Sequence, residues 1–203
     1  MDLTAGSARP PTAGAYFEAC WARSDDPWEH ATRWYETRKY RLTVDALPRP
    51  HYRRAFEPGS GTGVLTTLLA PRVDELVAME RHPRGAVATQ VRCRELPGVR
   101  VVTGAIPQDW PDGRWDLVVL SELLYYLDAA ALRATLECAA ASLDPDGHLV
   151  AVHYRPIVPE HAWNGDEIHE WLVAQPGWVR STRILDEAFV LDVLAPDAEP
   201  SHV

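Results

Sequence analysis

The sequence predicts an α/β fold with a mainly parallel sheet that carries helices on both faces. From residue 51 onward, short apolar runs alternate with helical patterns, which is typical of parallel strands joined by right-handed crossovers. A glycine-rich turn follows the first apolar run, at a strand-to-helix junction. Near the carboxyl end, two strand patterns flank the Asp186-Glu187 turn, which is too short for a crossover. The last strand should therefore run antiparallel, at or near one edge of the sheet.

The spacing of apolar residues predicts the individual helices and strands, and proline, glycine and capping residues indicate where they begin and end. Asp128 is a suitable cap for the helix after it, and Gly177 closes the last helix. We expect seven strands, at residues 53–59, 74–81, 99–106, about 118–121 and 147–155, with two more within 178–196. The helices between them should cover residues 62–72, 83–96, 128–143 and 166–177.

The chain should form one domain, residues 1–203, with an N-terminal part that differs from the rest. Residues 1–14 are rich in small residues and proline, so we expect a mobile arm. Residues of about 15–50 show helical spacing without strand patterns, and they should form a lid. The alternating region at about 51–196 is the expected core.

Two helices are expected in the lid. The first should begin near Tyr16, where aromatic residues are spaced to share one face. The second should begin at Pro27, because Asp26 is a good N-cap and Glu29 can complete a capping box. Pro48 should end it.

Composition and charge exclude several functions. The chain has 203 residues, of which 46% are hydrophobic, and a formal net charge of -9, which argues against general nucleic-acid binding and against an anionic membrane surface. Cys20, Cys93 and Cys138 are far apart, and they indicate neither a metal site nor a disulfide framework. The sequence shows no signal peptide and no apolar stretch of about 18 residues. We expect a cytoplasmic protein without nucleic-acid or membrane partners.

The stretch FEPGSGTG at residues 56–63 indicates a ligand site, because glycines allow positive φ and close approach to the main chain. Glu80 ends the next strand, where a carboxylate can accept both hydroxyls of a ribose. The order E-x-G-x-G-x-G differs from the G-x-G-x-x-G of dinucleotide sites, and no P-loop lysine is present. Glu57 is a poor neighbour for a pyrophosphate but a good one for an ammonium or a sulfonium. A cationic, phosphate-free nucleoside is therefore favoured over a phosphate ligand, and a tight loop without ligand is the third reading.

These residues, with DLVVLSELLYY at 116–126 and the final hairpin, resemble the class I S-adenosylmethionine-dependent methyltransferases over about residues 50–195. Longer stretches, DPWEHATRWYETRKYRLTVDALP, PQDWPDGRWDLVVLSELLYYL and GHLVAVHYR, are similar to the nodulation protein S-like branch. The member that names this branch N-methylates the free amine of a chitooligosaccharide glucosamine. The resemblance implies a Rossmann-like three-layer sandwich with a seven-stranded sheet. It also implies S-adenosyl-L-methionine as cofactor and S-adenosyl-L-homocysteine as product.

The family pattern, carried onto this sequence, implies which residues hold the cofactor. The methionine part would lie on the glycine-rich turn, the ribose on Glu80 and the adenine beside Arg81. Family members often carry an acid after the glycine that ends the third strand, but this chain has Ala105 there. The main chain of Ala105 and Ile106, with Trp110 nearby, would then contact the adenine. The full expected set is Glu57, Gly59, Ser60, Gly61, Gly63, Glu80, Arg81, Ala105, Ile106, Ser121 and Glu122.

Candidate catalytic residues follow the fourth and fifth strands, since open α/β sheets bind ligands at the carboxyl ends of their strands. An amine attacks through its lone pair, so it must be neutral before methyl transfer. Glu122 would hydrogen-bond the amine, His153 would act as base or orienter, and Tyr126 is the third candidate. Burial would raise the pKa of Glu122 and lower that of His153. Three alternatives stay open: the proton leaves through water, Glu122 only caps a turn, and His153 is a core histidine.

The lid offers aromatic faces and donors to an acceptor. The expected acceptor-binding residues are Trp28, Trp34, Tyr35, Arg38, Tyr125 and Tyr154, although such side chains also serve as core residues. Because Tyr125 and Tyr126 are consecutive, we expect one of them at most to face the site. The eight histidines show no spacing such as H-E-x-x-H, so no metal is expected.

Methyl transfer to a small molecule is the predicted function, with an amine on a sugar or a sugar-containing metabolite as acceptor. One alternative is O-methylation of a related hydroxyl, which demands a stronger base. Another is a cofactor-binding partner protein without transfer activity. The sequence predicts no oligomeric state.

Overall fold

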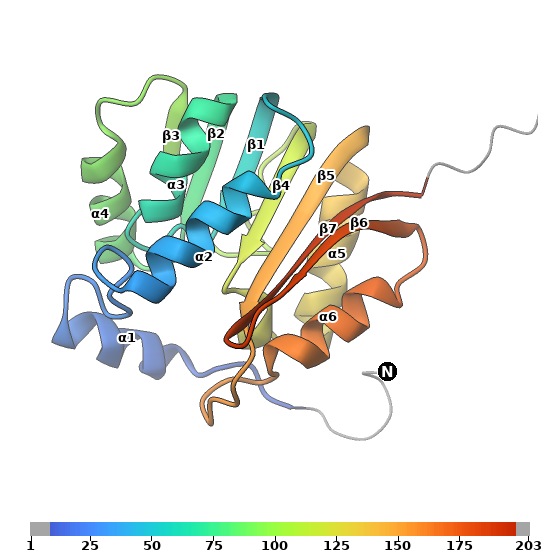
Figure 1. Ribbon diagram of the computed structural model, residues 1–203. Coiled ribbons are helices and arrows are strands. Elements are labelled where there is room, and N and C mark those ends of the chain that lie inside the picture. Colours follow the sequence, from blue (N-terminus) through green and yellow to red (C-terminus); the bar gives the residue numbers. More distant parts are fainter. Residues whose placement is uncertain (1–8, 198–203) are drawn as a thin grey trace, which may run out of the picture.

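The computed structural model describes residues 9–197, which form seven strands and six α-helices (Figure 1). The strands are β1 Tyr52–Pro58, β2 Val73–Glu80, β3 Val99–Thr103, β4 Trp115–Ser121, β5 Leu143–Tyr154, β6 Trp178–Leu185 and β7 Phe189–Pro196. The helices are α1 Gly14–Arg23, α2 Trp34–Asp45, α3 Val64–Leu69, α4 Pro83–Cys93, α5 Ala129–Ser142 and α6 Gly165–Val173. Two short 3-10 turns, η1 Ala70–Arg72 and η2 Leu124–Tyr126, complete the set in the described region.

The seven strands form one sheet in the order β3-β2-β1-β4-β5-β7-β6. β1 to β5 pair in parallel, and β7 is antiparallel to both of its neighbours, β5 and β6. The turn between β6 and β7 is too short for a crossover, so β7 must reverse direction. The predicted topology, with an antiparallel last strand next to one edge, is confirmed.

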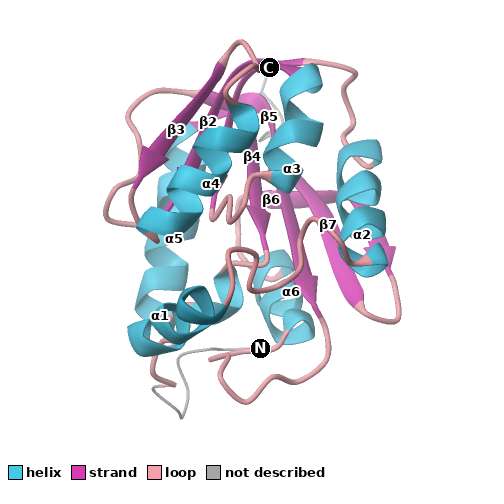
Figure 2. Cartoon of the chain, turned by 90° about the vertical axis from the view of Figure 1, so that its left-hand side faces the viewer, coloured by secondary structure: helices cyan, strands magenta, loops and turns pink. Residues whose placement is uncertain are grey.

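Helices cover both faces of the sheet. On one face, α2 and α3 bury Tyr40 and Leu69 against strand residues such as Leu117. On the other face, α5 and α6 bury Leu132 and Trp171 in a second apolar cluster. Figure 2 shows α2 and α5 on opposite sides of the sheet. The predicted three-layer sandwich is therefore confirmed. Among the described residues, no helix is long and apolar enough to span a membrane.

The second N-terminal helix begins later than the sequence predicts. α2 starts at Trp34, so the predicted start at Pro27 is wrong. The carboxylate of Asp26 accepts hydrogen bonds at 2.9 Å from the N–H groups four and five residues onward, and it thereby caps a turn instead of a helix. Glu29 has a φ of 57°, outside the helical region, and completes no capping box.

The predicted lid divides into two parts. α1 and the loop at residues 24–33 lie across the carboxyl ends of the strands, at the bottom of Figure 1. α2 instead packs on the sheet, and its Lys39 and Thr43 are fully buried. The first half of residues 15–50 therefore holds the position of a lid, whereas the second half belongs to the core.

The predicted arm is described in part. Residues 1–8 lie outside the described residues. Arg9 donates two hydrogen bonds of 3.0 Å to the carboxylate of Glu167 on α6. The Thr12 N–H donates to the Tyr126 carbonyl at 2.9 Å. Residues 9–13 are thus tied to the same end of the sheet as α1.

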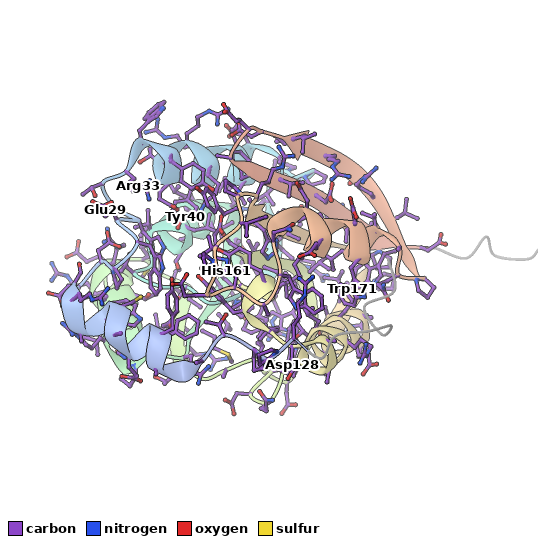
Figure 3. The ribbon with its side chains drawn as sticks, turned by 90° about the horizontal axis from the view of Figure 1, so that it is seen from below. Glu29, Arg33, Tyr40, Asp128, His161 and Trp171 are labelled. Atoms are coloured by element: carbon purple, nitrogen blue, oxygen red, sulfur yellow. The ribbon has the colours of Figure 1, made fainter. Side chains whose placement is uncertain are left out.

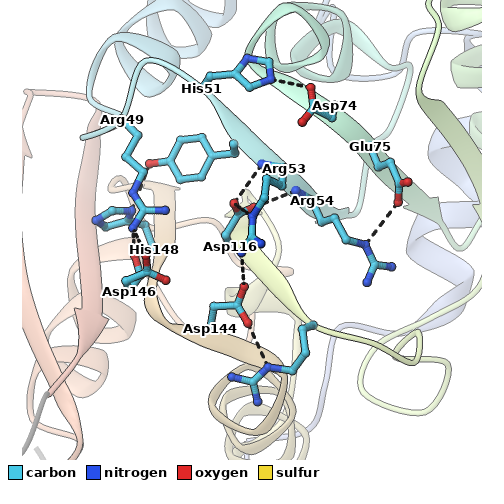
Figure 4. A network of polar contacts seen from close by, with 12 residues as sticks. Arg49, His51, Arg53, Arg54, Asp74, Glu75, Asp116, Asp144, Asp146 and His148 are labelled. Carbon is cyan, nitrogen blue, oxygen red and sulfur yellow. Dashed lines mark hydrogen bonds and ion pairs between the residues drawn. The ribbon is translucent and has the colours of Figure 1, made fainter.

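An ion-pair network lies at the opposite end of the strands (Figure 4). Asp116 accepts hydrogen bonds from the backbone N–H groups of Arg53 and Arg54, at 2.9 and 2.8 Å. Asp144 pairs with Arg53 and Arg114 at 3.1 Å each. Asp116 therefore joins the start of β1 to β4.

Candidate active site

A cavity of about 750 Å³ lies at the carboxyl ends of the strands, beneath α1 and the loop at 24–33. Its volume is in the range typical of small-molecule sites. Figure 3 looks onto this end of the molecule, with Tyr40 and His161 toward the middle of the view and Glu29 near the margin. The cavity is therefore placed where open α/β sheets bind ligands.

The glycine-rich turn forms one wall of the cavity. Gly59 and Gly61 line it, and both have positive φ, at 76° and 58°. A Cβ atom at Gly61 would lie 2.9 Å from Cε1 of His30 in the lid loop, so the turn and the lid are in close contact. Ser60 also lines the cavity, as predicted. Gly63 does not: it precedes α3 and lies against the backbone of Thr89 on α4, so helix packing accounts for it and a ligand contact does not.

Glu80 ends β2 and lines the same wall. Its carboxylate accepts hydrogen bonds from the N–H groups of Gly61 at 2.9 Å and of His82 at 2.8 Å. Burial raises the pKa of Glu80, against the effect of these backbone donors. The two bonds fix the carboxylate at the edge of the cavity, and each oxygen keeps a lone pair for a further donor.

Glu57 lies beside the glycine-rich turn and is almost fully buried, with 2% of its surface exposed. Burial raises the pKa of its carboxyl to about 8, although the nearby Thr66 hydroxyl acts in the opposite direction. One carboxyl oxygen, Oε2, has no hydrogen-bond partner in the described structure. A buried acid without a partner is costly, and a bound cation would relieve this cost.

The far end of the cavity differs in part from the expected adenine site. Arg81, Ala105 and Ile106 line it, as predicted. The Ala105 N–H, however, donates to the carboxylate of Asp109 at 2.9 Å and is not free for a ligand. Asp109 thereby places a carboxylate next to Ala105, the position after Gly104 at which this chain lacks an acid. Trp110 does not line the cavity. It packs against the apolar cluster on the face of the sheet that α5 and α6 cover, so it is not at the expected adenine site.

Glu122 follows β4 and lines the cavity beside Ser121. Its carboxylate accepts hydrogen bonds from Lys39 Nζ at 2.7 Å, from the Tyr154 N–H at 3.1 Å and from the Tyr125 hydroxyl. Burial alone would raise the pKa of Glu122, but Lys39 and these donors hold it below its ordinary value. The expected rise is therefore wrong, and the carboxylate is ionised at neutral pH. Its backbone has a φ of 54°, a strained value that only a well-braced residue keeps.

His153 does not fit the predicted role of a base. It is fully buried and does not line the cavity. Its Nε2 accepts from the Leu124 N–H at 3.1 Å, so Nδ1 carries the proton and donates to His169 Nε2 at 3.0 Å. His169 Nδ1 in turn donates to Asp192 at 2.8 Å. Burial lowers the pKa of His153 well below its ordinary value. Its burial and its two partners match the alternative of a core histidine.

Both tyrosines after β4 line the cavity, against the expectation that one would. Consecutive residues face opposite sides in a strand, but Tyr125 and Tyr126 lie in the 3-10 turn η2. Their rings meet edge to face, with centroids 4.6 Å apart. Burial raises the pKa of each phenol well above its ordinary value, so Tyr126 carries its proton at neutral pH and cannot act as a base.

The predicted acceptor-binding residues divide into two groups. Trp28, Tyr35 and Tyr154 line the cavity, and the rings of Tyr35 and Tyr154 have centroids 5.7 Å apart. Trp34 and Arg38 do not line it. Trp34 is 70% exposed, and Arg38 pairs with Asp186 at 2.7 Å beyond the cavity. These two predictions are therefore wrong.

The cavity is also lined by residues that are not among the predicted site residues. His30 from the lid loop and His161 from the loop after β5 line it, and burial lowers the pKa of each. Glu36 on α2 lines it as well. The W-Y-E-T-R-K run of α2 was the available signal, because Glu36 and Lys39 are three residues apart and share a helix face.

Several buried polar atoms of the lining have no hydrogen-bond partner among the described residues. They are Tyr35 Oη, Glu36 Oε2, Glu57 Oε2 and Ser121 Oγ. Buried polar atoms in native proteins are nearly always paired. All four atoms are oxygens that can form hydrogen bonds, which indicates a polar ligand. No group of metal-ligating side chains occurs within residues 9–197.

Comparison with known proteins agrees with this geometry. A model of the family "Nodulation protein S (NodS)" matches residues 21–165. Nodulation protein S of Sinorhizobium fredii is 30% identical over 129 residues, which cover 63% of this chain and 60% of that protein. The protein of Bradyrhizobium diazoefficiens is 29% identical over 128 residues, covering 62% and 61%. The matched region thus spans about three fifths of the length of these relatives.

Solved structures give the same result for the fold. A Pseudomonas syringae protein assigned as a methyltransferase is 41% identical, with a TM-score of 0.71 over 79% of this chain and 98% of that one. The N-methyltransferase NodS of Bradyrhizobium japonicum WM9, in complex with S-adenosyl-L-homocysteine, is 21% identical, with a TM-score of 0.77 over 90% and 97%. The chain therefore belongs to the nodulation protein S (NodS) family and has the fold of the class I S-adenosylmethionine-dependent methyltransferases.

Proposed function

We propose that this protein transfers the methyl group of S-adenosylmethionine to an amine, carried by a sugar or a sugar-containing metabolite. The family and the fold support the cofactor, since NodS is an N-methyltransferase whose structure contains S-adenosyl-L-homocysteine. When bound, the cofactor supplies an electrophilic methyl group on a sulfonium sulfur. The residues of this chain bind it, orient the acceptor and hold the protons.

The cavity fits the cofactor at two points. Glu80 is fixed by two backbone donors and keeps lone pairs for the ribose hydroxyls. Glu57 offers a buried carboxyl oxygen without a partner beside the glycine-rich turn, where a positive charge would be stabilised. A pyrophosphate, by contrast, would disfavour the ionised form of the same acid. These features support a cationic, phosphate-free nucleoside.

The basicity of the groups around Glu122 is the observation that favours an amine over a hydroxyl. Glu122 has a lowered pKa, and so do the imidazoles of His30 and His161. All three are weak bases, and the nearby tyrosines keep their protons. An amine gives up its proton to a weak base or to water, whereas a sugar hydroxyl demands a strong one. His30 and His161 take the place of His153 as proton acceptors.

A mass-spectrometric acceptor panel tests this function. The wild-type protein is incubated with S-adenosylmethionine and either glucosamine, N-acetylglucosamine or a chitooligosaccharide with one free amine. We expect one added methyl group on free amines and none on the acetylated form. Transfer to the acetylated form alone would establish O-methylation. Cofactor binding without transfer to any acceptor would indicate a partner protein without activity.

A further inference from the structure

A buried lysine in the wall of the cavity holds two carboxylates. Lys39 on α2 is fully buried, and its Nζ lies 2.7 Å from Glu122 Oε1 and 2.8 Å from Glu36 Oε2. The rings of Tyr35 and Tyr40 lie within 5.0 Å of the same nitrogen. One cation thus faces two anions, and this cluster of Glu36, Lys39 and Glu122 has a net charge of about -1 when both acids are ionised.

Glu122 uses its oxygens inside the protein. Lys39 donates to Oε1, while the Tyr125 hydroxyl and the Tyr154 N–H donate to Oε2. Its positive φ adds a strained backbone that these contacts hold in place. Glu122 is therefore a fixed part of the cluster, with its charge matched by Lys39.

Glu36 differs from Glu122 in one of its two oxygens, Oε2. Its contact with Lys39 is an ion pair without the alignment of a hydrogen bond, and Oε2 has no hydrogen-bond partner among the described residues. The residue is 6% exposed and lines the cavity. Buried carboxylates are stable only when they are paired and hydrogen-bonded. Lys39 can balance only one of the two negative charges, and Glu122 makes the fuller set of contacts. We therefore assign the remaining charge to Glu36, whose Oε2 also lacks a hydrogen-bond donor.

Among residues 9–197, Glu36 forms an ion pair with no cation other than Lys39. Arg33, one turn earlier, lines the cavity but pairs with Glu29 at 3.8 Å and is largely exposed. Burial lowers the pKa of His30, which keeps its imidazole neutral near pH 7. A cation that matches the cluster must therefore come from a ligand in the cavity.

We propose that Glu36 binds the positively charged amine of the acceptor, with Lys39 and Glu122 holding the cluster in place. The inference rests on the proposed function, in which the acceptor is an amine. A carboxylate forms strong, charge-assisted hydrogen bonds with an ammonium, whereas an N-acetyl group has no charge. The faces of Tyr35 and Tyr154 add favourable contacts for a cation. Glu36 thus selects free amines over acetylated ones.

Titration of sugars into the protein saturated with S-adenosyl-L-homocysteine tests the inference without any need for catalysis. The probes are glucosamine and N-acetylglucosamine, and the variants are Glu36→Gln and Glu36→Asp. We expect Glu36→Gln to bind glucosamine about ten- to a hundredfold more weakly, because a charge-assisted hydrogen bond is lost. N-acetylglucosamine should bind both proteins alike, and Glu36→Asp should recover part of the preference.

Glu29→Gln is the matched control, because Glu29 lies in the lid loop and its side chain is 65% exposed. It should bind both sugars as the wild type does. Unchanged glucosamine binding by Glu36→Gln, or a wild type that binds both sugars equally, would overturn the inference. If Glu36→Gln does not fold, Glu36→Asp decides, because it keeps the charge on a shorter side chain: a preference for glucosamine that is weaker than in the wild type supports the inference, and a preference equal to that of the wild type overturns it.

The experiments distinguish a failure of the proposed function from a failure of the amine subsite. Binding of glucosamine through Glu36 without methyl transfer would refute the function and leave the amine subsite standing. Methylation of glucosamine by Glu36→Gln at the wild-type KM would refute the subsite and leave the function standing.

Discussion

Glu57 is the residue that most clearly separates this site from a phosphate-binding turn. The sequence already places an acid two positions before the first glycine, and it thereby indicates a cationic ligand. The structure adds burial, which raises the pKa of the carboxyl to about 8 and leaves one oxygen without a partner. The type of residue could be predicted from the sequence, but its protonation could not, because burial depends on the packed fold.

Glu57 should lose a proton when a cationic ligand binds. With a pKa of about 8, the carboxyl is mostly protonated in the free protein at pH 7, and a neighbouring positive charge favours the ionised form. The affinity for S-adenosyl-L-methionine, which carries the sulfonium, should therefore rise from pH 6 to pH 8. Calorimetric titration in buffers with different ionisation enthalpies measures the released proton. Glu57→Gln should remove it, and a buffer-independent enthalpy in the wild type would contradict the account.

Glu80 should contribute to cofactor affinity through its hydroxyl acceptors. Glu80→Ala should weaken the binding of S-adenosyl-L-homocysteine by about 1–3 kcal/mol, the cost of losing buried hydrogen bonds. Glu75→Ala is the matched control, because Glu75 is on the same strand but is exposed and pairs with Arg54. Equal affinities of the two variants in the same titration would exclude Glu80 from the site.

At the scale of elements, the 3-10 turn η2 is held by a buried chain of side chains. Asp192 on β7, His169 on α6 and His153 on β5 are linked in series, and His153 accepts the Leu124 N–H at the start of η2. The two tyrosines that line the cavity follow in this turn. His153 therefore acts on the site as a positioning residue, through the backbone of η2.

Loss of His153 should affect stability more than cofactor binding. His153→Ala leaves the Leu124 N–H and a His169 nitrogen unpaired in the interior, so the free energy of unfolding should fall by about 2–4 kcal/mol. Urea unfolding measures this, and the affinity for S-adenosyl-L-homocysteine of the folded variant should change by less than about threefold. Unchanged stability with abolished methyl transfer would instead restore the role of base.

The strands could be predicted from the sequence, but the start of α2 and the long-range contacts of His153 could not. Strand–helix alternation predicts β1 to β5, because each strand is an apolar run bounded by turn signals. The start of α2 is wrong because Asp26 can cap a turn as well as a helix. The place of His153 is set by partners on α6 and β7, far along the chain, and no local pattern reveals them.

At the scale of the whole molecule, the sequence predicts a mainly parallel sheet with an antiparallel last strand, and it predicts the rim that holds the site, since both follow from the order of elements. It does not predict the charge cluster in the cavity wall. Lys39 lies 83 residues from Glu122 in the chain, and their contact depends on how α2 packs on the sheet. The missed residues of the site come from the lid loop, α2 and the loop after β5, which meet only in the folded protein.

The stability of the ligand-free protein should have its maximum near pH 6.5. Burial lowers the pKa of His30, His148, His153 and His161. The unfolded chain then binds more protons below about pH 6.5, so this stability is present above that pH and is lost as the pH falls. Glu57 acts in the opposite direction: its folded pKa of about 8 exceeds the ordinary 4.5, so its contribution is lost as the pH rises through this range.

Thermal unfolding across pH 5 to 8 measures both the loss of stability at low pH, caused by the histidines, and the loss at higher pH, caused by Glu57. The Tm should rise up to about pH 6.5, because four imidazoles outweigh the two carboxyls with raised pKa, Glu57 and Glu80. It should fall above that pH in the wild type but not in Glu57→Gln. A wild-type Tm that stays level between pH 6.5 and 8 would contradict the assignment of Glu57.

Calorimetric titration of S-adenosyl-L-homocysteine into the wild-type protein tests the central claim most directly, because function and acceptor selection both depend on this cofactor site. We expect saturable binding of one molecule per chain and a higher Tm in its presence, since a ligand that binds the native state stabilises it. A folded protein that gives neither heat nor a Tm shift with this ligand would contradict the claim.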